Sequence, residues 1–333
     1  MEKKNYIEKE YKSIDIMKFI AAIMVVCIHT LPFQSINPVV DNIFVGIFCR
    51  IAVPFFFISS SFLLFMKFNE DKYQNRKVII KYIKNIVKVY ILWSIVYLIL
   101  DNILGRKINL IEIIDKLFTT GFALQMWYFP AIIIAISIVY LWYEKLDLKG
   151  IILISSILYI IGLLGTTYYS LLDNLLMIKQ IIDCIISIFG TTRNGIFFGV
   201  PYVSLGYIIV CKYKNYDNNS SKEIKKNLLL LIISFFIMSF EGLIISIYVP
   251  NLNGRDMFIS LPFVSYFLYL LILSVNKYFK GDYKIFRKLS IKIFTTHVAI
   301  LYFISSNNSL IRFLLTISIS IGISIFIVLL DKK

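Results

Sequence analysis

The 333-residue sequence has few of the residues that bind metals or form disulfides, with only two histidines and four cysteines. His29 and His297 belong to no H-E-x-x-H pattern, and the cysteines lie in apolar segments at no spacing typical of metal ligands. We therefore expect no metal site, and we interpret the cysteines as small core residues. The sequence also lacks a P-loop and a glycine-rich dinucleotide-binding motif, which argues against soluble nucleotide-binding enzymes.

Charged residues are scarce as well. They make up 17% of the chain, whereas 59% of its residues are hydrophobic and 16% are aromatic. About a quarter of the residues of an ordinary soluble protein are charged. The mean hydropathy of +0.79 therefore predicts an integral membrane protein that has the lipid bilayer as its surroundings. The net charge of +15 does not indicate nucleic-acid binding, because most of it falls in the connections between apolar runs.

Apolar runs long enough to cross about 30 Å of hydrocarbon recur ten times along the chain. They are residues 15–33, 39–66, 78–100, 121–143, 150–165, 195–211, 227–249, 257–276, 286–305 and 310–330. The run at 173–190 contains Lys179 and Asp183, which favours an interfacial or re-entrant helix over another crossing. We expect an all-α fold, a single polytopic domain over residues 1–333 with about ten transmembrane helices.

Lysine and arginine crowd every second connection, including the polar linker at 212–227. By the positive-inside rule these connections face the cytoplasm, and both termini are then cytoplasmic. The first apolar run contains Asp15 and Lys18 and is followed by no small-residue cleavage site, so we expect it to remain as the first span. The predicted location is the cell membrane, with multiple crossings.

Six ionisable residues within or at the ends of these runs are the candidates for chemistry, because such groups are costly in hydrocarbon. They are Asp15, Lys18, His29, Arg50, Glu241 and His297. At about 100° per residue, Asp15, Lys18 and His29 fall on one stripe of the first helix. Structural roles stay open for most of them: a surface ion pair of Asp15 with Lys18, a pin to backbone carbonyls for Arg50, a partner role for Glu241 and a core position for His297.

His29 is the strongest candidate, because it lies near the outer end of the first helix, just before "TLPF". A neutral imidazole accepts a proton from a hydroxyl and returns it later, which is what a general base must do near neutral pH. Trp127 and Arg193 also stand at the outer ends of their runs. The outer side is therefore predicted to hold a polar acceptor, although "MWYFP" equally fits an interfacial aromatic belt.

Six stretches, in order, resemble the acyltransferase-3 family of multispan membrane acyltransferases over nearly the whole chain. "YKSIDIMKFIAAIMVVCIHT" is similar to a helix in which Arg precedes His by eleven positions, with Lys18 and His29 in those places. "CRIAVPFFFISSSFLLF" resembles the second-helix signature with Arg50, although Ser61 replaces the usual glycine. "KYIKNIVKVYILWSIVY" resembles the segment that carries a basic R-x-x-R pair, here Lys81 and Lys84.

The other three stretches lie in the later part of the chain. "QMWYFPAIII" contains Trp127, "TTRNGIFFGVPYVSLGYII" contains Arg193 and Asn194, and "LSIKIFTTHVAI" includes His297. "TTRNGIFFGVP" is most similar in wording to the membrane half of vancomycin-resistance-type serine racemases, a half associated with supplying L-serine. The racemase half is absent from these 333 residues.

The resemblance implies transfer of an acyl group, often acetyl from acetyl-CoA, to a hydroxyl of a cell-surface glycan or another small polar acceptor. In this interpretation acyl-CoA binds at Lys18, Lys81, Lys84 and Lys88, and the acceptor binds at Trp127, Arg193, Asn194 and His297. His29 is then the base, Glu241 or Asp15 orients it, and Arg50 stabilises the oxyanion. Lysine cannot grip phosphate in a bidentate way, which weakens the expectation for CoA. The alternatives are a transporter of a small solute such as L-serine, or an inert scaffold.

Overall fold

The structure, a computed structural model, describes residues 10–106, 108–214, 221–249 and 255–330. Within these ranges the chain forms helices and no strands. The α-helices are α1 (Lys12–Thr30), α2 (Pro38–Gly46), α3 (Ala52–Phe65), α4 (Lys72–Ile103), α5 (Leu110–Phe118), α6 (Tyr128–Lys145), α7 (Leu148–Leu164), α8 (Leu176–Phe189), α9 (Val200–Lys214), α10 (Ser221–Tyr248), α11 (Leu261–Val275), α12 (Lys284–Leu301) and α13 (Ser309–Leu330). Shorter turns are η1 (Phe48–Ile51), η2 (Tyr169–Asn174), η3 (Gly195–Gly199) and η5 (Asn276–Tyr278).

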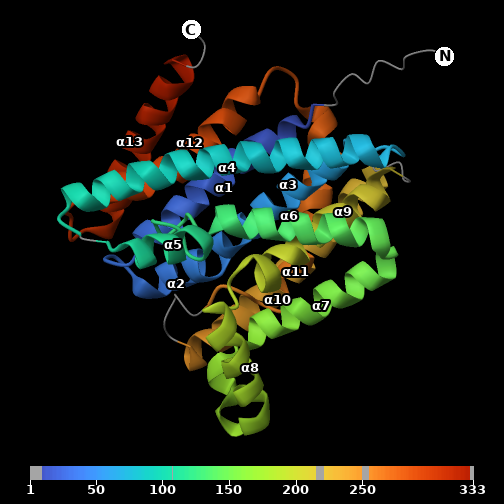
Figure 1. The fold of residues 1–333 in the computed structure, drawn as a ribbon, viewed down its shortest axis with the longest axis horizontal. Helices are drawn as coiled ribbons and strands as arrows, with labels where there is room; N and C mark the ends of the chain where they lie inside the picture. Colours follow the sequence, from blue (N-terminus) through green and yellow to red (C-terminus); the bar gives the residue numbers. More distant parts are fainter. Residues whose placement is uncertain (1–9, 107, 215–220, 250–254, 331–333) are drawn as a thin grey trace.

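Eight segments of the described chain are long and apolar enough to cross a membrane. They are Lys12–Thr30, Pro38–Phe65, Lys72–Ile103, Tyr128–Lys145, Gly195–Lys214, Ser221–Tyr248, Leu261–Tyr278 and Ser309–Leu330, and each overlaps a predicted run. The other two predicted runs form α7, which has 17 residues, and α12, which begins with a lysine-rich stretch. The prediction of an all-α, multi-pass membrane protein is thus confirmed (Figure 1).

The run at 173–190 forms the separate helix α8, which is not among these eight segments and projects from the bundle in Figure 1. The two charged residues that interrupt the run are both bound by side chains of the preceding turn η2. Lys179 Nζ lies 2.7 Å from an oxygen of Asp173, and the Tyr169 hydroxyl donates to Asp183 at 2.6 Å. Because these partners are local, α8 needs no contact with the other helices to pair its charged side chains.

Small residues let the central helices approach closely. Gly206 of α9 packs against α3 so tightly that a Cβ atom there would lie 2.7 Å from the carbonyl oxygen of Ile58. The hydroxyl of Ser61, next to Gly206, donates to the carbonyl of Val203 at 2.6 Å. Glycine and serine at such an interface replace hydrophobic driving force with close packing and an interhelical hydrogen bond, as is typical in membranes.

Three of the helical segments are irregular. The second span breaks at η1, between α2 and α3, and the span that ends as α9 begins with the π-helical turn η3. Helix α1 ends at Thr30, and the next residue, Leu31, has a φ of 50°. The side chain of Arg312 in α13 donates to the carbonyl of Thr30 at 2.7 Å. Irregular backbone within membrane spans is tolerated where protein or a cavity surrounds it, so these stretches point to the site.

Candidate functional site

The two histidines of the chain meet in the bundle, because α1 packs side by side with α12. The rings of His29 and His297 stack with their centroids 5.3 Å apart and their planes at 30°. Nδ1 of His297 lies 3.0 Å from the carbonyl oxygen of Ile293. A carbonyl only accepts, so Nδ1 carries the hydrogen and Nε2 is the basic nitrogen. His297 is fully buried, and its ring packs against one face of the His29 ring.

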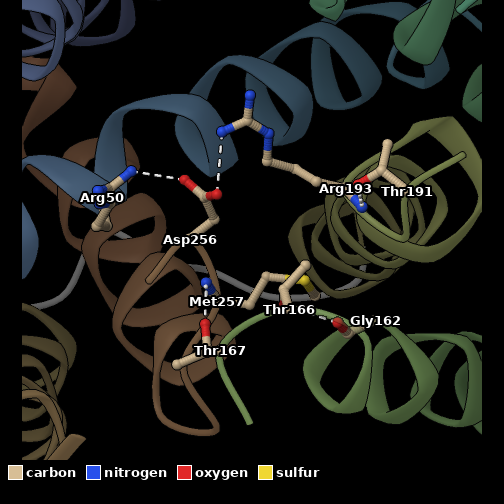
Figure 2. Close-up of polar contacts among 8 residues, drawn as sticks. All are labelled: Arg50, Gly162, Thr166, Thr167, Thr191, Arg193, Asp256 and Met257. Carbon is tan, nitrogen blue, oxygen red and sulfur yellow. Dashed lines mark hydrogen bonds and ion pairs between the residues drawn. The ribbon is translucent and has the colours of Figure 1, made fainter. Parts of the chain in front are cut away.

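Beside the histidines, one carboxylate is shared by two guanidinium groups. Arg50 in η1 donates to one oxygen of Asp256 at 2.6 Å, and Arg193 donates to the other at 3.0 Å, as Figure 2 shows. The Asp256 segment is anchored by the neighbouring amide of Met257, which donates to the Thr167 hydroxyl at 3.1 Å (Figure 2). Asp256 thus ties together the broken second span, the loop before η3 and the approach to α11.

His29 lines a small cavity of about 50 Å³. The cavity wall includes the polar residues His29, Arg50, Gln125, Arg193 and Asp256 together with Trp127 and Tyr128. The Arg193 guanidinium lies over the Trp127 ring, 5.1 Å from its centroid. Four residues proposed from the sequence, His29, Arg50, Trp127 and Arg193, are therefore brought to one cavity. Asp256 and Gln125 were not among the residues proposed from the sequence.

A much larger cavity, of about 1300 Å³, adjoins the His29 cavity and shares Trp127, Arg193 and Asp256 with it. Asn194 also lines the larger cavity. The Asn194 side chain accepts hydrogen bonds from the amides of Ile196 and Phe197, at 2.8 and 3.1 Å, and so starts the turn η3. We call this space the outer cavity.

A third cavity, of about 530 Å³, lies on the other side of His29, at the level of the N-terminal half of α1. Lys18, Lys67 and Lys81 line it, and it shares Tyr128 and Phe294 with the His29 cavity. We call this space the basic cavity. The three cavities therefore follow one another through the bundle, with His29 in the narrow middle one.

The comparisons with known proteins agree with this architecture. The model of the acyltransferase domain of the acyltransferase-3 family matches residues 11–330. The chain belongs to the acyltransferase-3 family. The resemblance drawn from six sequence stretches is thereby confirmed.

Curated relatives of this acyltransferase-3 chain are named as racemases. One, an amino-acid racemase of Enterococcus faecalis, is 28% identical over 96% of this chain and 46% of its own length. Another, a serine/alanine racemase of Enterococcus gallinarum, is 29% identical over 93% of this chain and 45% of its own length. The chain thus spans about half the length of these relatives. No solved structure matches.

Two lysines proposed for acyl-CoA do not reach the basic cavity of this acyltransferase-3 domain. Lys84 and Lys88 are exposed on α4 and are not part of the cavity wall, whereas Lys81, on the same helix, is. Lys67, at the end of α3, is a further cation of the cavity. The spacing of a basic pair along a helix does not tell which of its members faces inward.

Asp15 and Glu241 lie apart from His29. Asp15 is buried near the start of α1 and lies 3.9 Å from Arg287 of α12. Glu241 of α10 accepts from the amides of Ile259 and Ser260, at 2.6 and 3.0 Å, and from the hydroxyls of Ser260 and Tyr168. A carboxylate at these amides stabilises the start of α11. The structure therefore places the Glu241 side chain at the N-terminus of α11 and outside the His29 cavity.

The site as a whole is positively charged. Arg255, next to Asp256, is fully buried, and burial together with the neighbouring charge of Arg50 lowers the pKa of its guanidinium. An arginine stays protonated even so. Two guanidinium groups, those of Arg50 and Arg193, therefore share one carboxylate, and the charge of Arg255 lies close enough to Arg50 to affect its own pKa. Such a site favours a negative charge, either on a bound ligand or on an oxyanion formed during a reaction.

Proposed function

We propose that this domain is a membrane acyltransferase that moves a short acyl group such as acetyl from acyl-CoA in the basic cavity to a hydroxyl of a polar acceptor in the outer cavity. The observation that carries the proposal is the series of three cavities with His29 in the middle one. A donor and an acceptor that approach from opposite sides meet at one imidazole in this arrangement.

The donor site uses cations and an apolar wall. Lys18, Lys67 and Lys81 offer positive charge for the phosphates of CoA, and the remaining wall is mostly apolar, which suits the pantetheine arm. Lys18 and His29 are eleven residues apart on α1, or about 16 Å along the helix. An extended pantetheine arm covers a span of this size, so phosphates near Lys18 leave the thioester near His29.

The reaction transfers the acyl group from the sulfur of CoA to the oxygen of the acceptor hydroxyl. His29 takes the proton of the acceptor hydroxyl, and the oxygen attacks the carbonyl carbon of the thioester. The carbonyl oxygen becomes an oxyanion, which the arginines at the cavity stabilise. The carbon–sulfur bond then breaks, and the CoA sulfur takes the proton from His29. The products are an ester of the acceptor and free CoA.

The test is consumption of acetyl-CoA by purified protein in detergent, with and without lipid and glycan extracts as acceptors. His29→Ala should lower turnover by about 10²–10⁴-fold, the usual size of a general-base contribution. Cys184→Ser is the matched control, because Cys184 is exposed on α8 and lines none of the three cavities. Wild-type protein that never consumes acetyl-CoA, or an unaffected His29→Ala variant, overturns the proposal.

The proposed orientation places the basic cavity on the cytoplasmic side, where acyl-CoA is made, and both termini on that side too, in the cell membrane. A tag at the N-terminus should be protected from protease added to intact cells, whereas a tag at Asn253 should be accessible. Asn253 lies outside the described residues. The reverse pattern of protection contradicts this orientation.

A second candidate function is transport of a small polar solute such as L-serine or L-alanine. The curated relatives named as racemases favour it, and so does a positively charged constriction between two large cavities. A transporter moves the solute in proteoliposomes that contain no acyl-CoA. Uptake of labelled L-serine under those conditions, with no acetyl-CoA consumed, replaces the first proposal by the second.

A further inference from the structure

The side chain of Gln125, just before Trp127, is held in one orientation. Its Nε2 donates to the Tyr97 hydroxyl at 2.8 Å and lies 3.4 Å from the carbonyl of Thr295. The Tyr97 hydroxyl gives its own proton to the same carbonyl, at 2.8 Å, so it must accept from Gln125. If the amide were flipped, Oε1 of Gln125 would face the carbonyl oxygen of Thr295, and neither atom can donate a hydrogen bond. The amide nitrogen therefore faces Tyr97.

The amide oxygen of Gln125 consequently faces the other way. Gln125 is 2% exposed and lines the His29 cavity. Among the described residues, no group donates a hydrogen bond to its Oε1. Buried polar atoms are nearly always hydrogen-bonded, and one that is not is costly, so a buried acceptor in a cavity wall indicates a ligand that donates to it.

The opposite chemistry is found elsewhere in the same wall. Arg50 and Arg193 line this wall and share Asp256, so two guanidinium groups there have only one carboxylate between them. A ligand that fits both parts of the wall carries an anionic group for the guanidinium donors and a hydrogen-bond donor for Gln125. An apolar molecule, or a neutral one with acceptors alone, meets neither need.

The reacting hydroxyl cannot be the group that binds Gln125. A hydroxyl has one proton, and in the proposed reaction this proton goes to His29. The group that donates to Gln125 must then be a second hydroxyl or an ammonium group of the same molecule.

We infer that Gln125 Oε1 is a specificity-determining contact for the acceptor, and that the acceptor is a small anion with at least two hydrogen-bond donors. The inference rests on the proposed function, because it describes the acceptor of the proposed acyl transfer. The Gln125 contact selects molecules with the second donor, and the arginines hold the anionic group at the side of the outer cavity.

The test compares three simple probes by ligand-detected NMR titration of the purified protein in detergent, without acyl-CoA. D-glycerate and D-lactate are both carboxylates and differ by one hydroxyl, whereas glycerol has hydroxyls and no charge. Wild-type protein should bind D-glycerate about fivefold more tightly than D-lactate, the size expected of one net hydrogen bond. Glycerol should bind at least about tenfold more weakly than D-glycerate, since a charged hydrogen bond is lost.

Gln125→Met keeps the length of the side chain and removes the acceptor oxygen. This variant should bind D-glycerate and D-lactate equally, with D-lactate binding unchanged. Gln34→Met, the same substitution at an exposed position after α1, should keep the fivefold preference. Equal binding of the two acids by wild-type protein overturns the inference even if the variant does not fold, and so does a preference that survives in Gln125→Met.

The outcome is independent of catalysis. A lost preference in Gln125→Met together with no consumption of acetyl-CoA by wild-type protein keeps the subsite and removes the acyltransferase proposal. Consumption of acetyl-CoA together with equal binding of the two acids keeps the acyltransferase proposal and removes the subsite. Glycerol that binds as tightly as D-glycerate removes the anionic part of the inference.

Discussion

Replacing Asp256 by asparagine tests the shared ion pair without changing the shape of the side chain. The two pairs that Asp256 makes differ in burial: the side chains of Arg50 and Asp256 are 8% and 11% exposed, whereas Arg193 is 36% exposed. Breaking a buried pair by removing one partner costs about 3–5 kcal/mol, while an exposed pair contributes about 0–1 kcal/mol. Nearly all of the effect of Asp256→Asn should therefore come from Arg50.

The assay is thermal unfolding in detergent, followed by intrinsic tryptophan fluorescence. At roughly 2 °C per kcal/mol for a chain of this size, Asp256→Asn should lower Tm by about 6–10 °C. Arg193→Gln, which breaks only the half-exposed pair, should lower it by about 2 °C or less. The difference between the two variants carries the argument, because both remove one charge at the same cavity.

A double variant completes this experiment. Arg50→Met removes the buried cation, so adding Asp256→Asn to it should cost much less than Asp256→Asn alone. Equal losses in Asp256→Asn and Arg193→Gln, or full additivity of Arg50→Met with Asp256→Asn, would show that Asp256 is not the counterion of Arg50.

Three further variants test other parts of the structure. Lys81→Ala should weaken acetyl-CoA binding in a way that shrinks with added salt, whereas Lys84→Ala, outside the basic cavity, should not; equal effects in a filter-binding assay would contradict the cavity assignment. Gly206→Val should prevent folding or lower Tm strongly, because its Cβ would lie 2.7 Å from the Ile58 carbonyl oxygen; normal yield of stable protein in size-exclusion chromatography would refute that contact. Glu241→Gln should lower Tm by a few degrees through weaker bonds to the start of α11, and an unchanged Tm would show that these bonds contribute little.

The sequence predicts the helical fold well, because apolar runs of about twenty residues have few alternatives in a bilayer. Eight of the ten predicted runs meet length and composition criteria for a span. The other two runs do not meet these criteria for different reasons. Helix α7 has only 17 residues, and α12 begins with the exposed cations Lys284, Arg287 and Lys288.

The candidate site is less readable from the sequence, because contacts between helices decide it. His29 and Arg50 stand out as ionisable groups in apolar runs, but nothing in their spacing indicates that His297 stacks on His29. Asp256 lies in a connection, where acidic residues are ordinary, and Gln125 carries no charge. Their importance follows only from the pairing of Asp256 with two arginines and from the burial of Gln125.

Glu241 illustrates the opposite difficulty. A carboxylate in an apolar run indicates chemistry, since it is costly in hydrocarbon. Here the four donors from Tyr168, Ile259 and Ser260 supply a sufficient structural reason for it. A single sequence cannot separate these two origins of a buried charge, because the donors come from the connection after α7 and from the residues just before α11.

The narrow layer at His29 also has an electrical consequence. Where water fills cavities on both sides of a membrane, the transmembrane voltage falls mainly across the thin, poorly conducting layer between them. That layer here contains Trp127, Tyr128 and Phe294 around His29. One elementary charge moved through 100 mV changes free energy by about 2.3 kcal/mol, or up to about 50-fold in an equilibrium. In the proposed orientation, an anion that advances from the outer cavity to the arginines crosses part of this field, so an inside-negative potential would oppose its binding although no charge crosses the membrane.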